Sequence, residues 1–240
     1  TFGRRGYRPQ ISLEGFDAKL LKPQNVAEML HVGSRDLGFA GADWVAELGL
    51  DLVELLDTRL DPVRIVAAAA PEFDPEGPRF RVATEYQRLT EAWLAEEGYD
   101  GRVVRAYGAT EVFPPEDADC VVDNTATGET LRANGLHIFA TLLHSSTRLY
   151  ASRRAMEDPL KRRGIEHFTM LCKAVLDARG RVMVEANVPA ECVDALVAVL
   201  PGMGQPTVAT LAGGGGYAVK AAVPRSQLPT LIPKIKEAGG

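Results

Sequence analysis

The chain has 240 residues, 46% hydrophobic and 25% charged, and this length suits one large domain or two to three small ones. Its net charge of −5 argues against a nucleic-acid surface, which needs clustered Lys and Arg. No apolar run approaches the roughly 20 residues that span a bilayer, and three scattered cysteines are too few for a disulfide framework or a zinc site. We therefore expect a cytoplasmic protein that binds neither nucleic acid nor membranes.

Apolar segments that suit buried strands alternate with segments of helical period over the first two thirds of the chain. The expected strands are residues 20–21, 36–40, 63–70, 80–83, 103–107, 120–122 and 148–151. The expected helices are residues 24–32, 42–48, 90–97 and 130–134. This alternation predicts an α/β fold with mostly parallel sheets.

A turn-rich segment, residues 71–78 (PEFDPEGP), separates two halves of this region. We expect the chain to return to the first half near residues 143–151. The result is a two-lobed arrangement of the kind found in type II periplasmic binding proteins, with a ligand between the lobes at the C-terminal ends of strands.

The last third predicts a separate module after a connecting helix at residues 166–179. Its expected order is strand 181–186, helix 190–200, strand 207–212, strand 217–223 and helix 227–238. This βαββα order predicts a ferredoxin-like domain with its own core. The glycine run at residues 213–216 joins two expected strands, which favours a hairpin over a phosphate loop. The module lacks a grouping of acid, base and nucleophile, so a regulatory or assembly role fits it better.

The most informative stretch runs from Cys120 to Leu131 (CVVDNTATGETL). An apolar strand ends in the carboxylate of Asp123, and Thr127-Gly128-x-Thr130 follows. Gly128 lets the backbone approach an anion, and the two hydroxyls with free N–H groups of a following helix can coordinate phosphate oxygens. Taken alone, the string supports a turn with an N-cap about as well as a phosphate loop.

Four segments, residues 21–43, 81–86, 123–136 and 145–149, follow the order and spacing of one family. The chain resembles ATP phosphoribosyltransferases, the enzymes of the first step of histidine biosynthesis. Its tail is similar to the family's long form, through residues 181–189, 200–208 and 217–224. The resemblance implies a first catalytic lobe of residues 1–71 and 143–168, a second lobe of residues 72–142, and a regulatory domain of residues 169–240.

The resemblance also implies a reaction and its ligands. The phosphoribosyl group of phosphoribosyl pyrophosphate (PRPP) is transferred to N1 of ATP, with Mg²⁺ as cofactor and histidine as feedback inhibitor. A homo-oligomer between dimer and hexamer is implied as well. Because departure of diphosphate leaves an oxocarbenium-like C1′, the site needs positioning and charge stabilisation rather than a covalent nucleophile.

Individual residues receive roles from the same resemblance. The residues implied to bind PRPP are Asp123, Thr125, Ala126, Thr127, Gly128 and Thr130. Catalytic roles fall on Asp123 and Glu111, and Glu111 also lines the diphosphate and magnesium region. The residues implied to bind ATP are Lys22, Asp36, Leu37, Gly38, Gly41 and Arg81. Asn187 and Thr207 are implied to bind histidine.

Structural alternatives stay open for several of these residues. Glu111 suits the first turn of a helix equally well, and the glycines near Asp36 suit tight strand-to-helix packing. Lys22 and Arg81, expected at strand ends near the cleft, are alternatively solvated cations. Asn187 and Thr207 are alternatively strand-end caps.

The sequence also departs from the family's pattern. Glu85 and Glu129 stand where basic or neutral residues are more common, and the segment after Glu111 is one residue short. Family members open with a strand and a Pro-Lys-Gly-Arg-Leu turn, so we expect that strand and a basic substrate contact to be missing from a sequence that starts at Thr1. These departures leave one alternative open, a catalytically impaired two-lobed small-molecule-binding or regulatory protein of the same fold. Because the resemblance implies an oligomer, a second alternative is a subunit that works only in an assembly.

Overall fold

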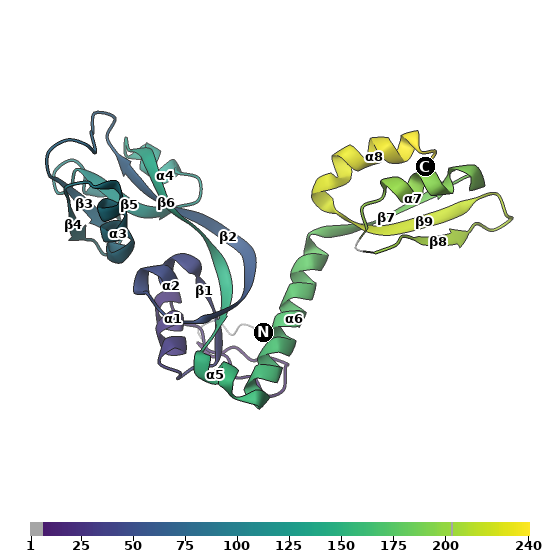
Figure 1. The fold of residues 1–240 in the computed structure, drawn as a ribbon, viewed down its shortest axis with the longest axis horizontal. Helices are drawn as coiled ribbons and strands as arrows, with labels where there is room; N and C mark the ends of the chain where they lie inside the picture. Colours follow the sequence, from purple (N-terminus) through teal and green to yellow (C-terminus); the bar gives the residue numbers. More distant parts are fainter. Residues whose placement is uncertain (1–6, 203) are drawn as a thin grey trace. The chain divides into compact units, whose positions relative to one another are not determined.

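The computed structural model describes residues 7–202 and 204–240 (Figure 1). The chain divides into two compact units, one ending at Thr169 and the other comprising Met170–Gly240. Each unit has its own sheet, of six strands in the first and three in the second. Helix α6 (Pro159–Arg179) contains the point of division.

The first unit is built on a mixed sheet with the strand order β1-β6-β2-β5-β3-β4. The strands are β1 (Leu37–Gly41), β2 (Val53–Ala69), β3 (Phe80–Thr84), β4 (Gly101–Arg105), β5 (Cys120–Thr125) and β6 (His137–Ala151). The helices are α1 (Pro23–His31), α2 (Ala42–Leu48), α3 (Gln87–Glu97), α4 (Glu129–Ala133) and α5 (Arg153–Glu157), with a 3₁₀ turn η1 at Thr110–Val112. The helices expected at residues 24–32, 42–48, 90–97 and 130–134 are therefore confirmed as α1 to α4.

The expectation of a mostly parallel sheet is wrong. In the described part of the chain, β1 with β6, β6 with β2, and β2 with β5 pair antiparallel, whereas only β3 with β5 and β3 with β4 pair parallel. Each antiparallel pair involves β2 or β6, which extend for 17 and 15 residues. The expected strands at residues 63–70 and 148–151 overlapped only part of them, so the pairing of these two long strands with each other was not foreseen.

The two long strands take part in both lobes (Figure 1). Strand β1 pairs with the Thr147–Ala151 end of β6, and β5 pairs with the Arg64–Ala69 end of β2. Between these ends the β2–β6 register shifts several times, and Arg59 and Asp61 adopt positive φ. Residues 71–78 join β2 to β3. The lobe limits near residues 71 and 143 therefore stay a prediction, because the same strands serve both lobes.

One short strand was expected wrongly. Residues 20–21 lie outside any strand, and Lys22 immediately precedes α1. Pro23 occupies the first turn of that helix, where its missing N–H costs nothing. Two leucines followed by this helix start have no length to form a sheet ladder.

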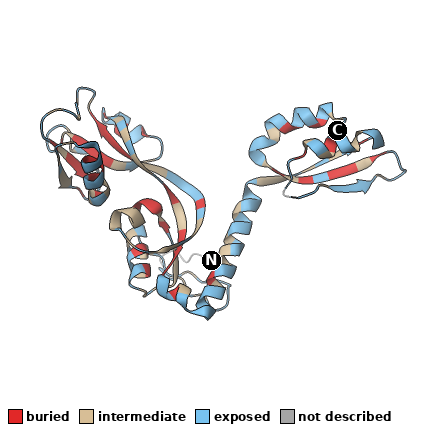
Figure 2. Cartoon of the chain, viewed as in Figure 1, coloured by how far each residue is buried: buried red, intermediate tan, exposed pale blue. Residues whose placement is uncertain are grey.

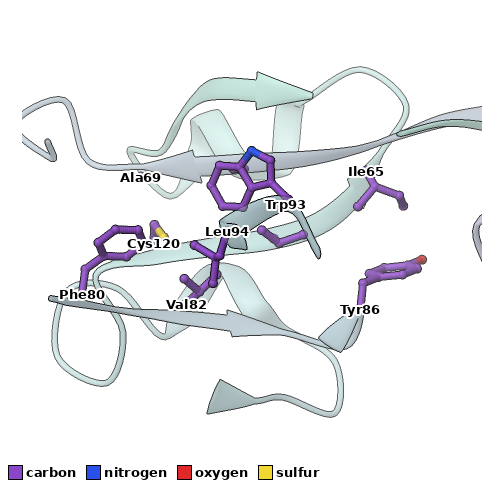
Figure 3. Close-up of a cluster of buried hydrophobic side chains, with 10 residues drawn as sticks. Ile65, Ala69, Phe80, Val82, Tyr86, Trp93, Leu94 and Cys120 are labelled. Carbon is purple, nitrogen blue, oxygen red and sulfur yellow. The ribbon is translucent and has the colours of Figure 1, made fainter. Parts of the chain in front are cut away.

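The core of the second lobe lies between its strands and α3. Figure 3 shows Trp93 and Leu94 of α3 packed over Phe80 and Val82 of β3 and Cys120 of β5. Burial raises the pKa of the Cys120 thiol to about 12, so this cysteine is a neutral core residue. All three cysteines are free. Among residues 7–202 and 204–240, no helix combines the length and apolarity that a membrane span requires.

The second unit has the predicted ferredoxin-like order. Its elements are β7 (Arg181–Val188), the turn η2 (Ala190–Cys192), α7 (Val193–Val199), β8 (Thr207–Thr210), β9 (Tyr217–Pro224), the turn η3 (Arg225–Gln227) and α8 (Leu228–Glu237). Strand β9 lies between β7 and β8, antiparallel to both, so the glycine run does join a hairpin. Leu196, Val219 and Leu231 form the centre of a core between sheet and helices, and β8 is exposed along its length (Figure 2).

Gly38 provides a stability prediction. A Cβ at Gly38 would lie 2.6 Å from Cγ1 of Val26, so α1 packs on β1 only because this residue has no side chain. We expect Gly38→Ala to lower the free energy of unfolding by about 1–3 kcal/mol through overpacking. A Cβ at Gly164, within α6, would meet open space, and Gly164→Ala should raise stability by about 0.5–1 kcal/mol. Thermal unfolding of both variants tests this, and a Gly38→Ala protein as stable as Gly164→Ala would contradict it.

Candidate phosphate-binding site

A short loop joins β5 to α4, which is the strand–loop–helix order that the sequence predicted. Gly128 adopts φ +76° directly before α4, a left-handed conformation that favours glycine. The backbone N–H of Gly128 donates to Oγ1 of Thr125 at 2.8 Å, which closes the loop. The first N–H groups of α4 have no partner within the helix. In α4 the N–H of Glu129 donates to Thr127, whereas the N–H groups of Thr130 and Leu131 have no hydrogen bond to another described residue.

Thr127 and Thr130 are both exposed at this loop. Oγ1 of Thr127 accepts from the N–H of Glu129 at 3.3 Å. Because a hydroxyl both accepts and donates, this local bond leaves the proton of Thr127 available to an anion. The turn and phosphate-loop interpretations are therefore compatible at Thr127. Glu129, at the start of α4 next to the loop, is also exposed.

Asp123 is a half-buried carboxylate at the start of this loop. Oγ1 of Thr110, a fully buried residue, donates to its Oδ2, and the N–H of Asn124 donates to its Oδ1 at 2.6 Å. Burial raises the pKa of Asp123 above its usual value, the two hydrogen bonds lower it, and the charge of Glu111 raises it. Glu111 directly follows Thr110, whose hydroxyl binds Asp123, so the fold brings the segments of the two carboxylates together although 12 positions separate them in the sequence.

Glu111 lies in η1, which follows Gly108 and Ala109 in left-handed conformations. Both interpretations of this residue find a structural basis, since it sits in the first turn of a short helix and also lies near Asp123. In residues 7–202 and 204–240 no three His, Cys, Asp or Glu side chains are grouped to hold a metal by themselves. Mg²⁺ is commonly held by one or two carboxylates together with substrate phosphates. The pair of Glu111 and Asp123 fits that donor set.

The residues expected to bind ATP lie at three places: Lys22 before α1, residues 36–41 on and beside β1, and Arg81 on β3. Gly41 directly precedes α2 and the buried Asp43. At the other end of β1, Gly38 packs against Val26, and Asp36 forms an ion pair with Lys161 at 2.8 Å. The packing alternative therefore accounts for Gly38. Leu37 begins β1, and Lys22 directly precedes α1.

Arg81 requires a correction. It lies at the start of β3, and its guanidinium binds the carboxylate of Asp119 at 3.2 Å and donates to the carbonyl oxygen of Glu116 at 3.1 Å. Strands β3 and β5 run parallel, so Arg81 and Asp119 stand at the end of the sheet opposite to the loop after Thr125. Arg81 is thus neither at the strand end beside the loop nor a free cation.

Sequence reasoning missed four polar residues next to Asp123. Tyr86, Asp43 and Ser145 are buried, and hydrogen bonds connect them through Asn124 to Asp123. All four lie within the segments that carry the family resemblance. Nothing in the spacing of these residues shows that they meet, because Asp43 and Ser145 are 102 positions apart.

In the second unit, Asn187 and Thr207 are both exposed on the sheet face opposite to the helices. Asn187 is paired with Ala218 and Thr207 with Lys220, so they lie about 12 Å apart, two strand spacings across β9 and two residues along it. A groove of about 550 Å³ lies next to this face, between the end of α6 and the start of β7. Its lining includes Met170, Lys173, Asp177, Arg181, Met183 and Ala222.

The fold defines a class: a two-lobed α/β protein of the periplasmic-binding-protein type with a strand–loop–helix unit at residues 120–133, followed by a ferredoxin-like domain. Residues 22–174 match the family described as ATP phosphoribosyltransferase, and residues 178–240 match the HisG C-terminal domain. The chain belongs to the ATP phosphoribosyltransferase family, in its long form.

Individual relatives agree with this assignment. The ATP phosphoribosyltransferase of Pelotomaculum thermopropionicum is 36% identical over 100% of this chain and 86% of its own length. That of Prosthecochloris aestuarii is 38% identical over 98% of this chain and 83% of its own length. Among solved structures, an ATP phosphoribosyl transferase (HisG:HisZ) complex from Thermotoga maritima matches with a TM-score of 0.64 and 22% identity, over 72% of this chain and 88% of that chain.

Proposed function

We propose that this chain transfers the phosphoribosyl group of PRPP to N1 of ATP and releases diphosphate, with the loop from Asp123 to Thr130 holding the ribose-5-phosphate end. The observation that carries the proposal is this loop in a family member: Gly128 is left-handed, two threonine hydroxyls are exposed, and a carboxylate pair adjoins it. The reaction is the first step of histidine biosynthesis.

The chemistry requires positioning more than a reactive side chain. The lone pair of N1 forms the new bond to C1′ while the bond from C1′ to diphosphate oxygen breaks, and diphosphate keeps that electron pair. The protein must hold two anionic substrates in line and stabilise positive charge at C1′. A carboxylate beside the ribose suits this need, and we assign that role to Asp123.

We assign Mg²⁺ to Glu111 and Asp123 together with substrate phosphates. When bound, the ion would neutralise charge on the diphosphate leaving group. The ATP subsite is proposed in the first lobe near Gly41, with Lys22 as its cation. Leu37, Gly38 and Asp36 then act through the position of β1, and Arg81 has no part in it.

For the C-terminal unit we propose histidine as a feedback inhibitor, bound at the groove beside the exposed sheet face. Lys173 and Arg181 suit its carboxylate, and Asp177 suits its ammonium group. Asn187 and Thr207, on the same face as Met183, remain candidates for the imidazole. A homo-oligomer and a cytoplasmic location complete the proposal.

The decisive experiment incubates the purified chain with ATP, PRPP and magnesium and follows phosphoribosyl-ATP by absorbance. We expect product formation that stops in excess chelator and resumes when magnesium is restored, and inhibition when histidine is added. Full turnover in chelator would contradict the metal assignment. PRPP binding without turnover would instead support the catalytically impaired binding protein.

A further inference from the structure

A continuous series of hydrogen bonds connects β6 to the carboxylate of Asp123. Oγ of Ser145 donates to Oδ1 of Asp43 at 2.7 Å. The hydroxyl of Tyr86 donates to Oδ2 of Asp43 at 2.9 Å. Nδ2 of Asn124 donates to the Tyr86 oxygen at 3.0 Å and to Oδ1 of Asp123 at 3.3 Å.

The inner members of this series are removed from water. Tyr86 is 0% exposed, Asp43 5% and Ser145 6%. A buried carboxylate is costly unless donors satisfy it, and Asp43 forms no ion pair with any described residue. Its two oxygens depend on the hydroxyls of Ser145 and Tyr86. Hydroxyl orientation around Asp43 is therefore strongly determined.

This orientation is transmitted to the loop. Both carboxylate oxygens of Asp43 accept hydrogen bonds, so the single hydroxyl proton of Tyr86 points to Asp43. The remaining lone pairs of Tyr86 then need a donor, which must be the amide nitrogen of Asn124 and not its oxygen. The same nitrogen contacts Oδ1 of Asp123. The hydrogen-bond directions at Asp43 thus fix the orientation of the Asn124 amide and, through it, of the Asp123 carboxylate.

Helix α2 also fixes Tyr86 by packing. The ring of Trp44 stacks on that of Tyr86 with centroids 4.8 Å apart. The carboxylate of Glu47 accepts from the N–H groups of Arg88 and Leu89 at 3.0 Å each, in the first turn of α3. In Figure 3 the ring of Tyr86 lies beyond the end of β3, on the side of the cluster where Ile65 lies and away from Phe80. Asp43 and Glu47, one helical turn apart on α2, thus hold the segment that carries Tyr86.

We propose that Tyr86 is a positioning residue for phosphoribosyl transfer: through Asn124 it holds the Asp123 carboxylate in the orientation that PRPP needs, and Asp43 and Ser145 hold Tyr86. The inference rests on the proposed role of the loop from Asp123 to Thr130. It assigns to the first-lobe helix α2 a direct influence on the substrate contact of the second lobe.

Tyr86→Phe tests the proposal, because it keeps the ring and removes only the hydroxyl. We expect about a tenfold weaker PRPP affinity and a lower kcat, the effect of one lost hydrogen bond in the series. Asn124→Ala should have a similar effect, and the double variant should be little worse than either, since the residues act as a unit. Asp43→Asn, which keeps an acceptor, should lose less than Asp43→Ala.

Ser145→Ala and Ser146→Ala form a matched pair that separates positioning from stability. Ser146 is 8% exposed and donates to Oδ1 of Asp57 at 2.6 Å, outside the series. Both variants should lose similar stability, but only Ser145→Ala should weaken PRPP binding. If Tyr86→Phe fails to fold, this pair of serine variants still tests the positioning role.

Equal PRPP affinity in the two serine variants, or additive effects of Tyr86→Phe and Asn124→Ala, would overturn the inference. Affinity is measured directly with PRPP, by calorimetry, so the result does not depend on turnover. If the chain binds PRPP but forms no product, the proposed reaction is contradicted. The inference is still tested in that case, because the affinities of the variants can be compared. A chain that binds no PRPP overturns the loop assignment and the inference with it.

Discussion

Asp123→Asn is expected to lower kcat/KM for PRPP by roughly 10- to 150-fold, the value of a charged hydrogen bond. The change removes the negative charge that we place beside the ribose while keeping the size of the side chain. Steady-state kinetics with PRPP varied at saturating ATP measures the effect.

The pH dependence of activity provides a second, independent test of the role of Asp123. Burial raises the pKa of Asp123, so its carboxylate becomes protonated at a higher pH than an ordinary aspartate. Activity of the unaltered chain should therefore fall as the pH is lowered through this raised pKa, and the acid limb should lie above the usual 3.8. Asp123→Asn should lack that limb. An unchanged acid limb in the variant would assign it to another group.

We expect Asp123→Asn to keep or raise the stability of the chain although it lowers activity. A raised pKa in the folded state means that the folded chain loses stability as the pH rises from the unfolded value through the folded value. Asparagine carries no charge and so avoids the free-energy cost of a buried ionised carboxylate. Asp123→Asn should therefore have a melting temperature at neutral pH equal to or above that of the unaltered chain. Asp119→Asn, directly before the same strand, is the matched control: Arg81 lowers the pKa of Asp119, so this variant should lose stability and keep its PRPP kinetics.

The second large effect concerns the hydroxyls of the loop. Thr130→Ala should weaken PRPP affinity by about ten- to a hundredfold, because it deletes one donor to a charged phosphate. Thr127→Ala should weaken affinity to a similar extent and also cost about 1 kcal/mol of stability, since its oxygen accepts from Glu129 N–H.

Serine variants at the same two positions are the controls, because serine keeps the hydroxyl and removes only the methyl group. We expect Thr127→Ser and Thr130→Ser to bind PRPP nearly as the unaltered chain does. Calorimetric affinity and the melting temperature are compared for all four variants. Lower melting temperatures with unchanged PRPP affinity would show that the loop is only a turn before a helix, and would contradict the phosphate-loop assignment.

Local signals explain what could be predicted about the site. The strand–loop–helix unit at residues 120–133 depends on an apolar run, a glycine with φ +76° and hydroxyl acceptors within three positions of their donors. Each of these is visible within a dozen residues of sequence. The βαββα unit was likewise predictable, because alternating strand and helix periods determine which faces form its core.

Signals that depend on distant partners were missed or misread. The middle of β2 contains Asp57, Arg59 and Asp61, and lacks the pattern of a buried strand. It is a strand because β6, from about 80 to 100 positions later, pairs with it. Arg81 was expected at a strand end near the cleft because a strand end was recognised without its direction in the sheet. Parallel pairing of β3 with β5 places it at the opposite end.

By itself, the sequence determined the family, the two-lobed α/β class, the small C-terminal domain and the strand–loop–helix unit at residues 120–133, because these depend on motifs and periods within short segments. Only the tertiary structure decided that Tyr86, Asp43 and Ser145 form one hydrogen-bonded series ending at Asp123. The physical reason is burial: polar groups removed from water must find partners wherever folding brings them, and here those partners lie up to 102 positions apart.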